Sequence, residues 1–523
     1  MKYPSNYTQY KNALQKIADI KYASAVLQWD QETYLPKNGN EARGRQIATL
    51  NELAHEQFTD SKLGDLMSEL IFANQLSEHE KRNVTLSLED YNKNKKLPST
   101  FVRKMSEMVN KSFHAWLHAR RENKFSIFKN PLQEIIELKK QEADLLGYEN
   151  HPYNALMNDY DKGLTTTIVD KLFSDLQPQL SHILEKITAQ PNVDDSMLQQ
   201  HFDKTAQWDT GIEILKRMHF NFDAGRQDIS EHPFTTNFSS KDVRVTTRVD
   251  ENDFGNMLWS CIHEGGHALY EQGLPDDEYG LPLGEYCSLS IHESQSRLWE
   301  NCIGRSLPFW KHNYKLLQQK FPKQFQNKTV EEFYAVINKV QPSLIRTEAD
   351  EVTYHFHVII RYEIEKLLIE GALKTKDIPS FWNEKYKNYL GVSVLNDVQG
   401  CLQDVHWSHG SFGYFATYSF GSLYAAQFYS SIKNIHSNIE NEVCQGQTEK
   451  VWDWLKNNIY SHGRYFNSEE LCKASTGKVL ESKYFIDYLK NKYLQELTRL
   501  FYKKNPTAIL FILLLKKLLK NQY

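Results

Sequence analysis

The chain has 523 residues, of which 40% are hydrophobic and 24% are charged, and its 62 basic residues nearly balance its 66 acidic residues. This composition is typical of a folded globular protein and argues against extensive disorder. The net charge of -4 excludes the strongly basic balance of most nucleic-acid-binding proteins and indicates no general affinity for membranes. The six cysteines lie far apart without a CxxC pair, which is typical of reduced thiols.

The N-terminal sequence MKYPSNYTQYKNALQKIADIKY is polar and lacks the apolar run of a secretory signal, so we expect a cytoplasmic protein. Helical periodicity dominates the chain. Residues 131–148 (PLQEIIELKKQEADLLGY), for example, repeat apolar side chains at intervals of three and four. No repeat, low-complexity block or Gly/Ser/Pro-rich linker divides the sequence. The expected fold is mostly α, in a single large domain.

One short segment departs from the helical pattern. Residues 242–249 (DVRVTTRV) are rich in β-branched side chains and predict a small sheet. A helix is expected to follow at once. It should begin near Asp250 or Asn252, whose side chains can cap free N–H groups, and end near Gly273, where glycine can take a left-handed turn.

This helix carries the sequence HEGGH, in which His263 and His267 are four residues apart. Side chains at that spacing project from one face, so both imidazoles can bind one zinc ion at about 2.0 to 2.1 Å, with Glu264 beside the open coordination position. Gly265 and Gly266 each cost a helix about 1 kcal/mol relative to alanine. They predict another segment packed closely against the metal-bearing face. The alternative is a chance occurrence of a short motif.

A catalytic zinc site of this type takes a third protein ligand from a second helix. The downstream sequence GEYCSLSIHESQSRLWEN has a helical pattern, and its Glu293 lies 26 residues after His267, which leaves room for a turn and an antiparallel return. Glu293 is therefore the first candidate. The spacing excludes neither Glu285 nor Glu300, and His292 could bind the ion in a different arrangement.

Several further motifs occur in a fixed order along the chain. They are LQWDQETYLP near the N-terminus, HPF at 232–234, DVRVT at 242–246, HEGGH at 263–267, HESQSRLWEN at 292–301, IRTEAD at 345–350, GCLQDVHW at 400–407 and GYFATY at 413–418. Through these motifs the chain resembles the carboxypeptidase Taq family of metallocarboxypeptidases, over about residues 5 to 495. Such an ordered set is far more specific than an HExxH motif alone.

The resemblance implies an α-helical, saddle-like protein of the glutamate-zincin type, with a deep active-site groove, a small β-sheet at its edge and usually a homodimer. It also implies one divalent ion per subunit, zinc or sometimes cobalt, and release of single residues from the free C-termini of peptides with broad preference. By their positions in the motifs, the metal ligands become His263, His267 and Glu293, and the catalytic glutamate becomes Glu264. Ala416 departs from the family, whose members often have proline there, and is expected to loosen the tyrosine-bearing loop.

The oxyanion of the tetrahedral intermediate needs a hydrogen-bond donor besides the metal. The candidates are His406, Tyr414 and Tyr418, because related glutamate-zincins place a histidine and tyrosines in a late segment of similar spacing. The alternative for each tyrosine is a role in core packing, since the chain contains 29 tyrosines.

An exopeptidase must also bind the free carboxylate of its substrate, for which the planar guanidinium of arginine is well suited. Arg346 and Arg244 both lie in family-like motifs, and Arg346 is preferred. The alternative for either is a structural ion pair. Arg346 and Asp350 have the helical spacing for such a pair.

The resemblance does not explain the C-terminal tail, residues 498–523, so the metallocarboxypeptidase domain is placed at residues 1–497. As a helix, the apolar run at 508–515 would span about 12 Å, too short for a bilayer core of about 30 Å. We expect a subunit contact or a poorly ordered extension rather than a membrane-surface helix.

Two other functions compete with a metallocarboxypeptidase acting on peptides. One is a zinc-dependent endopeptidase or oligopeptidase with the same metal site, which would also cut a peptide amidated at its C-terminus. The other is a helical binding protein without enzymatic activity, which the intact set of metal-binding residues disfavours. Neither a nucleic-acid partner nor a transmembrane segment is expected.

Overall fold

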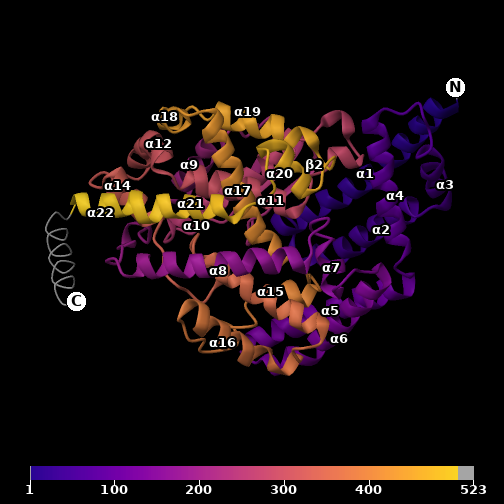
Figure 1. Cartoon of the computed structure of the whole chain (residues 1–523), viewed down its shortest axis with the longest axis horizontal. Helices are drawn as coiled ribbons and strands as arrows, with labels where there is room; N and C mark the ends of the chain where they lie inside the picture. Colours follow the sequence, from indigo (N-terminus) through magenta and orange to yellow (C-terminus); the bar gives the residue numbers. More distant parts are fainter. Residues whose placement is uncertain (1, 505–523) are drawn as a thin grey trace.

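Helices account for most of the computed structural model, which describes residues 2–504 (Figure 1). Before the sheet come α1 (Lys2–Thr33), α2 (Asn40–Phe58), α3 (Ser61–Leu70), α4 (Glu78–Lys95), α5 (Ser99–Arg121), α6 (Phe125–Leu146), α7 (Pro152–Met157), α8 (Thr166–Thr188) and α9 (Lys204–Arg217). The sheet is followed by α10 (Phe254–Gly273), α11 (Leu289–Arg297), α12 (Leu307–Lys320), α13 (Pro322–Phe325) and α14 (Val330–Ile337). The rest comprises α15 (Tyr354–Glu370), α16 (Ile378–Leu390), α17 (Phe415–Ile435), α18 (Ile439–Cys444), α19 (Glu449–Asn458), α20 (Ser468–Thr476), α21 (Ser482–Leu489) and α22 (Leu497–Lys504). The prediction of a mostly α fold is confirmed.

Local sequence signals begin several of these helices. At α4, the Ser77 hydroxyl accepts a hydrogen bond from the backbone N–H of Glu80, whose carboxylate accepts one from the Ser77 backbone N–H. The same reciprocal pair begins α14 and α20. Such capping boxes satisfy N–H groups that the first helical turn leaves free. Segments Leu298–Gly304 and Lys490–Glu496 are π-helical, and they extend α11 and α21.

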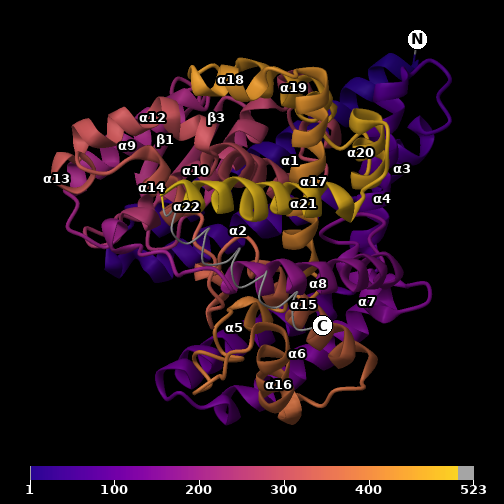
Figure 2. The ribbon, with the colours of Figure 1, turned by 60° about the vertical axis from the view of Figure 1, so that its left-hand side comes forward.

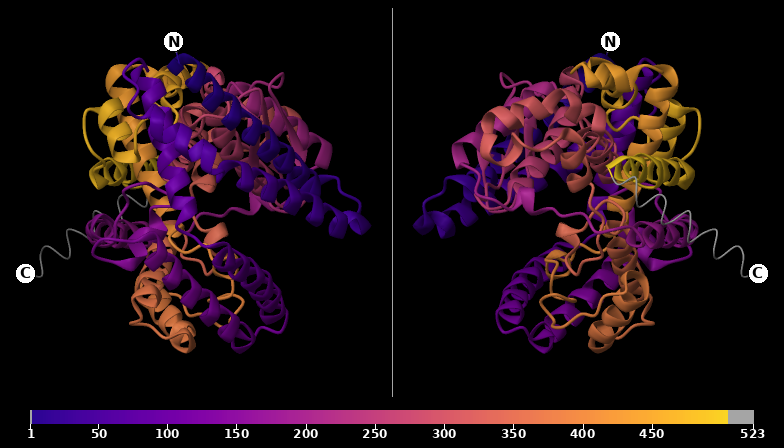
Figure 3. Two further views of the ribbon diagram at one scale, coloured as in Figure 1. Left: turned by 90° about the vertical axis from the view of Figure 1, so that its right-hand side faces the viewer. Right: turned by 90° about the vertical axis from the view of Figure 1, so that its left-hand side faces the viewer.

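The helices divide into lobes. Helices α5, α6 and α16 lie together in one lobe, whereas α9, α12 and α14 lie in another (Figures 1 and 2). The two side views in Figure 3 show the same division. A groove of about 1150 Å³ is lined by residues of α4, by the segments around α7 and before α11, and by residues 464–467. This groove agrees with the expected one.

The predicted small sheet is present. It contains β1 (Gly225–Ile229), β2 (Thr235–Ser239) and β3 (Asp242–Thr247) in the order β1-β3-β2. Strand β3 pairs in parallel with β1 and antiparallel with β2, with Thr235 opposite Val245. Val243 and Val245 are buried against α10, so one face of the sheet belongs to the core.

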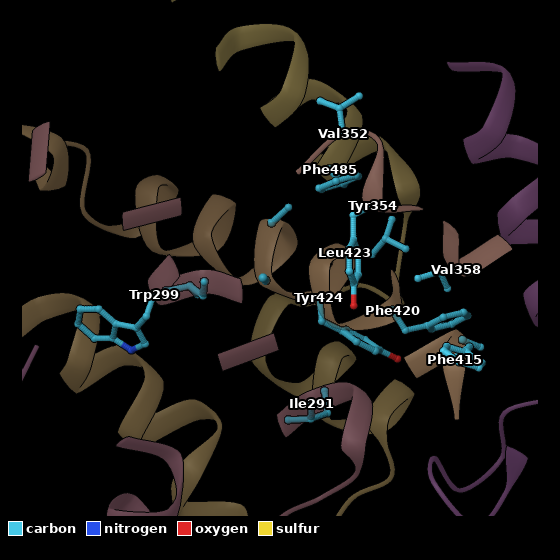
Figure 4. Close-up of a cluster of buried hydrophobic side chains, with 14 of the residues drawn as sticks. Ile291, Trp299, Val352, Tyr354, Val358, Phe415, Phe420, Leu423, Tyr424 and Phe485 are labelled. Carbon is cyan, nitrogen blue, oxygen red and sulfur yellow. The ribbon is translucent and has the colours of Figure 1, made fainter. Parts of the chain in front are cut away.

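Most buried apolar side chains form one continuous core, part of which is shown in Figure 4. There Ile291 of α11, Tyr354 of α15 and Leu423 of α17 lie in one cluster, so these three helices form a shared scaffold. A smaller second cluster joins α1 to α4 with Leu281. Within residues 2–504, no helix combines the length and the apolar character needed to cross a membrane. The apolar run at 508–515 lies outside the described residues, and the boundary at residue 497 stays a prediction.

Candidate metal centre and active site

Helix α10, which carries HEGGH, begins slightly later than predicted and ends at Gly273, as predicted. Asp253 caps its first turn and the helix begins at Phe254, because Asp250 instead accepts a hydrogen bond in the preceding turn. Gly273 is the last helical residue, and the predicted left-handed turn there is wrong. A Cβ at this position would lie 2.4 Å from a ring carbon of Tyr460, so packing accounts for the glycine.

The two central glycines allow close packing on two sides of α10, as predicted. A Cβ on Gly266 would lie 2.6 Å from the Cα of Ser296 and 2.8 Å from the carbonyl oxygen of Gln295, both on α11. A Cβ on Gly265 would lie 2.6 Å from the side chain of Leu215 on α9. The close approach of α11 brings its side chains to the histidine-bearing helix.

Three side chains from α10 and α11 converge. Glu293 Oε2 lies 3.9 Å from His263 Nε2 and 3.7 Å from His267 Nε2. These separations are only slightly above the roughly 3.4 Å between neighbouring ligands of a tetrahedral zinc ion. Within the described residues, this is the one group of His, Cys, Asp or Glu side chains whose ligand atoms lie within 4.8 Å of one another. Two imidazoles and one carboxylate form a donor set that suits zinc.

Both histidines are held at the ring nitrogen that faces away from the cluster. His263 Nδ1 lies 2.9 Å from Glu300 Oε2, and His267 Nδ1 lies 3.1 Å from the carbonyl oxygen of His292. His267 Nδ1 also lies 2.6 Å from His292 Nδ1, so the outer nitrogen of each ring is engaged by a neighbour. When each Nδ1 carries the proton, the lone pair of each Nε2 is free for a metal. Burial raises the pKa of Glu300, but His263 and two arginines outweigh it, so the pKa lies well below its usual range and Glu300 stays ionised.

The Glu293 carboxylate is oriented in the same manner. Its Oε1 accepts a hydrogen bond of 2.7 Å from Arg297 Nε, one helical turn later, which leaves Oε2 for the cluster. Helix α17 supports it from the other side, where a Cβ on Gly421 would lie 2.5 Å from Glu293 Cγ. Arg297 in turn packs 4.6 Å from the ring centre of Tyr354.

The other candidate ligands do not join this group. Glu285 forms an ion pair with Arg464 at 2.7 Å, and Glu300 binds the outer nitrogen of His263. The imidazole of His292 lies 2.8 Å from Glu271 through Nε2 and 2.6 Å from His267 Nδ1 through its own Nδ1, so it contacts the outer nitrogen of His267. The geometry therefore favours Glu293 as the third ligand.

Glu264 lies on the same helix and is 8% exposed. Its Oε2 accepts a hydrogen bond of 2.7 Å from the hydroxyl of Thr235, at the start of β2. The same hydroxyl lies 2.9 Å from the Glu264 carbonyl oxygen. Burial raises the pKa of Glu264, while His263 and Thr235 act against this shift. The pKa of Glu264 therefore lies above its ordinary value, which favours a carboxyl group that both accepts and returns a proton.

The late motifs meet in one aromatic group. The ring centres of Tyr414 and Tyr418 lie 5.0 Å apart, and that of His406 lies 5.4 Å from that of Tyr414. Positions 414, 418 and 421 are spaced along one face of a helix, and Gly421 contacts Glu293, so both tyrosines lie on the Glu293 side of α17. The expected tyrosine loop is wrong in part, because Ala416 and Tyr418 lie inside α17, whose first turn tolerates either alanine or proline.

These aromatic side chains are neutral. Burial raises the pKa of Tyr414 to about 12, so its phenol remains a hydrogen-bond donor. Burial lowers the pKa of His406 to about 4, and the nearby guanidinium of Arg346 acts in the same direction. A neutral imidazole can donate a hydrogen bond without bringing a charge.

Arg346 is buried beside this aromatic group. Its Nε donates a 2.9 Å hydrogen bond to Asp404 Oδ1, and its guanidinium lies 5.0 Å from the ring centre of Tyr418. The alternative pair with Asp350 is wrong, because Asp350 instead accepts hydrogen bonds at the start of α15. Arg361 binds the other oxygen of Asp404 at 2.6 Å. Two buried guanidinium groups thus share one carboxylate.

Arg244 lies elsewhere. Alternate residues of a strand face opposite sides, and Val245 pairs with Thr235, which contacts Glu264. Arg244 therefore faces away from Glu264. It pairs with Asp242 at 3.0 Å and packs 4.2 Å from the ring centre of Trp29 in α1. The structure does not bring Arg244 together with His263, His267 and Glu293.

Several supporting residues escaped prediction from the sequence. Arg297 was detectable, since it lies four residues after Glu293 in a helix. Thr235, Asp404 and Arg361 had no such signal, because their partners lie in distant segments. The groove lies next to this site, because its lining residues Tyr160, Glu271 and Tyr286 contact Tyr414 and His292.

A helical fold with HExxH on one helix and the third ligand on the next defines a metal-dependent peptide hydrolase of the glutamate-zincin type. The sequence pattern of the carboxypeptidase Taq (M32) metallopeptidase family matches residues 9–493, and the chain belongs to this family. It is a metallocarboxypeptidase, a hydrolase that acts on peptide bonds.

The relatives agree over nearly their whole lengths. Carboxypeptidase 1 of Bacillus subtilis is 37% identical over 487 residues, which cover 93% of this chain and 97% of that protein. The crystal structure of the M32 carboxypeptidase from Deinococcus radiodurans is 36% identical, with a TM-score of 0.93 and coverage of 94% and 99%. A structure described as that of CHT is 54% identical, with a TM-score of 0.93 and coverage of 94% and 100%.

Proposed function

We propose that this metallocarboxypeptidase binds one zinc ion per subunit through His263, His267 and Glu293, with cobalt as an alternative ion. The observation that carries the proposal is the convergence of two Nε2 atoms and one carboxylate oxygen, each freed by a hydrogen bond on its far side. When bound, the ion supplies Lewis acidity, which acidifies water and polarises a carbonyl group.

The side chains around this position divide the remaining work. Glu264 takes a proton from the attacking water onto its carboxylate and delivers it to the nitrogen of the leaving amine. The Thr235 hydroxyl keeps that carboxylate in place. His406, Tyr414 and Tyr418 are neutral donors, and we assign them to the oxyanion of the tetrahedral intermediate.

Arg346 is proposed to bind the C-terminal carboxylate of the peptide. Arg346 and Arg361 are both buried and share Asp404, so their group carries one positive charge in excess. A buried charge without a partner is costly, and a substrate carboxylate would balance it. Binding of a free C-terminal carboxylate supports release of single residues rather than internal cleavage. The family resemblance supports broad specificity for the released residue.

The test compares a peptide with the same peptide amidated at its C-terminus. Removing one partner of a buried charged pair costs about 2 to 5 kcal/mol, so Arg346→Ala should lose roughly 30-fold or more in kcat/KM on the free peptide. The amidated peptide should be a poor substrate and should lose little more. Arg244→Ala, on the far face of the sheet, is the matched control and should not discriminate between the peptides. An equal loss on both peptides in Arg346→Ala would make that arginine structural.

The digestion products distinguish a carboxypeptidase from an endopeptidase or oligopeptidase. Mass spectrometry of digested peptides should show ladders that shorten by one residue, whereas an endopeptidase or oligopeptidase would produce internal cuts. We also propose a cytoplasmic homodimer: the family resemblance supports the dimer, and the six free cysteines fit a reducing compartment. Light scattering of the purified protein and cell fractionation test these two assignments.

A further inference from the structure

We propose that Glu365 of α15 is a positioning residue, which holds the segment carrying His406 and Tyr414 in its active geometry. The inference rests on the proposed roles of these two residues. The Glu365 side chain is fully buried, and it is not part of the metal cluster or of the arginine group. Its partners nevertheless connect it to the site.

The Glu365 carboxylate accepts hydrogen bonds next to both proposed oxyanion donors. The indole Nε1 of Trp407 donates to Oε1 at 2.8 Å, and the backbone N–H of Gly413 donates to Oε2 at 2.8 Å. Trp407 directly follows His406, and Gly413 directly precedes Tyr414. The Glu365 carboxylate thus fixes the chain at the residue after His406 and at the residue before Tyr414.

The segment between these two anchors is tightly shaped. Residues His406–His409 form a single 3-10 turn, and Gly410 and Gly413 have φ of 71° and 98°. A Cβ on Gly413 would lie 2.7 Å from the carbonyl carbon of Leu156 in α7. Gly413 is therefore packed closely against α7, and both this contact and its positive φ require glycine. Without the Glu365 carboxylate, the Gly413 N–H would be buried without a hydrogen-bond acceptor. This unsatisfied donor would favour a shift of the segment between Trp407 and Gly413.

A carboxylate suits this position better than its amide does. Tyr153 OH is a third donor, which lies 2.5 Å from Oε2. Burial raises the pKa of Glu365 to about 7 although these three donors lower it, so the activity of the variants is compared at pH 8, where the group is a carboxylate. A carboxylate only accepts hydrogen bonds and has about four lone-pair sites, whereas a glutamine places an NH₂ group against one of the donors. Glu365→Gln therefore preserves shape and disrupts the anchoring.

Arg346 is held independently, by Asp404 and by the Tyr354 hydroxyl. Loss of the Glu365 contacts should thus disturb the oxyanion donors more than carboxylate binding. A displacement of about 1 Å costs on the order of 100-fold in rate, so kcat of Glu365→Gln should fall roughly 10- to 100-fold while KM changes little. Metal content should be unchanged.

A double-mutant cycle separates positioning from simple destabilisation. If Glu365 acts through the donors, the penalty of Glu365→Gln should nearly vanish in a His406→Ala/Tyr414→Phe background. A penalty of the same factor in both backgrounds would overturn the inference. Tyr153→Phe is the matched control, because it removes a donor to the same carboxylate while both anchors remain, and its kcat should stay near that of the wild type.

If Glu365→Gln does not fold, Trp407→Phe breaks one anchor and keeps the carboxylate. It should lower kcat several-fold, with the same disappearance in the His406→Ala/Tyr414→Phe background, and an unchanged kcat would overturn the inference. Full activity of His406→Ala and Tyr414→Phe would instead overturn the oxyanion assignment itself. Losses in these variants without a loss in Glu365→Gln would overturn only the positioning role.

Discussion

At the scale of single residues, the orientation of His263, His267 and Glu293 depends on hydrogen bonds to the atoms of these side chains that face away from the proposed metal site. The outer nitrogen of His263 is bound by Glu300, and Glu300 also lies 3.1 Å from Arg305 Nη2 and 3.4 Å from Arg297 Nη1. Arg297 also donates a hydrogen bond to Glu293, which belongs to the proposed metal site. These residues form a closed network of alternating charges. Partners of this kind fix ligand orientation and typically change metal affinity 10- to 100-fold.

Glu293 and Glu264 should respond differently to the same substitution. Glu293→Gln should lose metal on dialysis, because the amide is no longer an anionic ligand. Glu264→Gln should retain metal and lose about 100- to 10,000-fold in kcat, because only the proton acceptor is removed. Elemental analysis and peptide hydrolysis on the same samples check both. Equal metal loss in the two variants would contradict the division of roles.

At the scale of elements, helix α11 is held between α10 and α17 at two glycines. Gly266 meets the α11 backbone, and Gly421 meets the Glu293 side chain. Both contacts are closer than any Cβ allows. Because the proposed metal ligands come from α10 and α11, the separation of these helices sets the distance between the ligands.

Gly266→Ala should therefore push α10 and α11 apart, lower the melting temperature and weaken metal binding. Gly44→Ala is the matched control, because Gly44 lies inside α2 and a Cβ there meets nothing within 4 Å. That substitution should be neutral or stabilise by up to about 1 kcal/mol. Thermal unfolding with and without added zinc measures both effects. A Gly266→Ala variant with wild-type metal affinity would show that the two helices can separate without opening the site.

At the scale of the whole molecule, buried neutral histidines make stability depend on pH. Burial lowers the pKa of His355 to about 3, with a further contribution from Arg297, and lowers that of His406 to about 4. The unfolded chain takes up a proton at each near pH 6.5, whereas the folded chain does not until lower pH. Stability is therefore present above pH 6.5 and is lost as the pH falls toward 4.

His355→Gln should reduce this loss. Each such histidine costs about 2 kcal/mol at pH 5.0 relative to pH 7.5, so the variant should lose that much less between the two conditions. Glutamine can keep a hydrogen bond to the Ser419 hydroxyl, which lies 3.0 Å from His355 Nδ1. Urea unfolding at both pH values provides the measurement. An identical pH dependence in wild type and variant would refute the assignment.

The C-terminal segment from Lys492 to Thr498 forms hydrogen bonds with distant parts of the chain. Lys492 Nζ lies 2.7 Å from Glu351 Oε2 and 3.2 Å from the carbonyl oxygen of Asn301. It thus joins the last residue of the motif at 292–301 to the residue that follows the motif at 345–350. Glu496 accepts a hydrogen bond from the Tyr334 hydroxyl. The Thr498 hydroxyl accepts one from Gln190 and donates one to the carbonyl oxygen of Tyr493. The described contacts thus extend just past the predicted boundary at residue 497.

Two truncations separate these contributions. Truncation after Tyr493 should leave an active enzyme that is less stable by about 1 kcal/mol for each hydrogen bond lost. Truncation after Leu489 also removes Lys492 and leaves the buried Glu351 unpaired, which should cost about 3 to 5 kcal/mol. Thermal unfolding and peptide hydrolysis check both. Equal stability of the two truncated chains would contradict the role of Lys492.

Local periodicity determines much of this protein. The helical repeat and the spacing of His263 and His267 depend only on residues a few positions apart, so the sequence by itself predicts a mostly α fold and two ligands on one helix face. The β-branched run at 242–249 likewise predicts the strand that became β3. The ordered motifs add the family and its reaction, because they record a pattern along the whole chain.

Only the tertiary structure decided how distant segments meet. Spacing made Glu293 the first candidate without excluding Glu285 or Glu300. The approach of α11 to α10 at Gly266 brings the Glu293 carboxylate to within 4.8 Å of a ring nitrogen of both His263 and His267. The same holds for Thr235 beside Glu264, and for Asp404 as the partner of Arg346 in place of the nearby Asp350. The physical reason is that helical spacing relates only residues within a few turns, whereas contacts between segments depend on which side chains and glycines let their backbones approach.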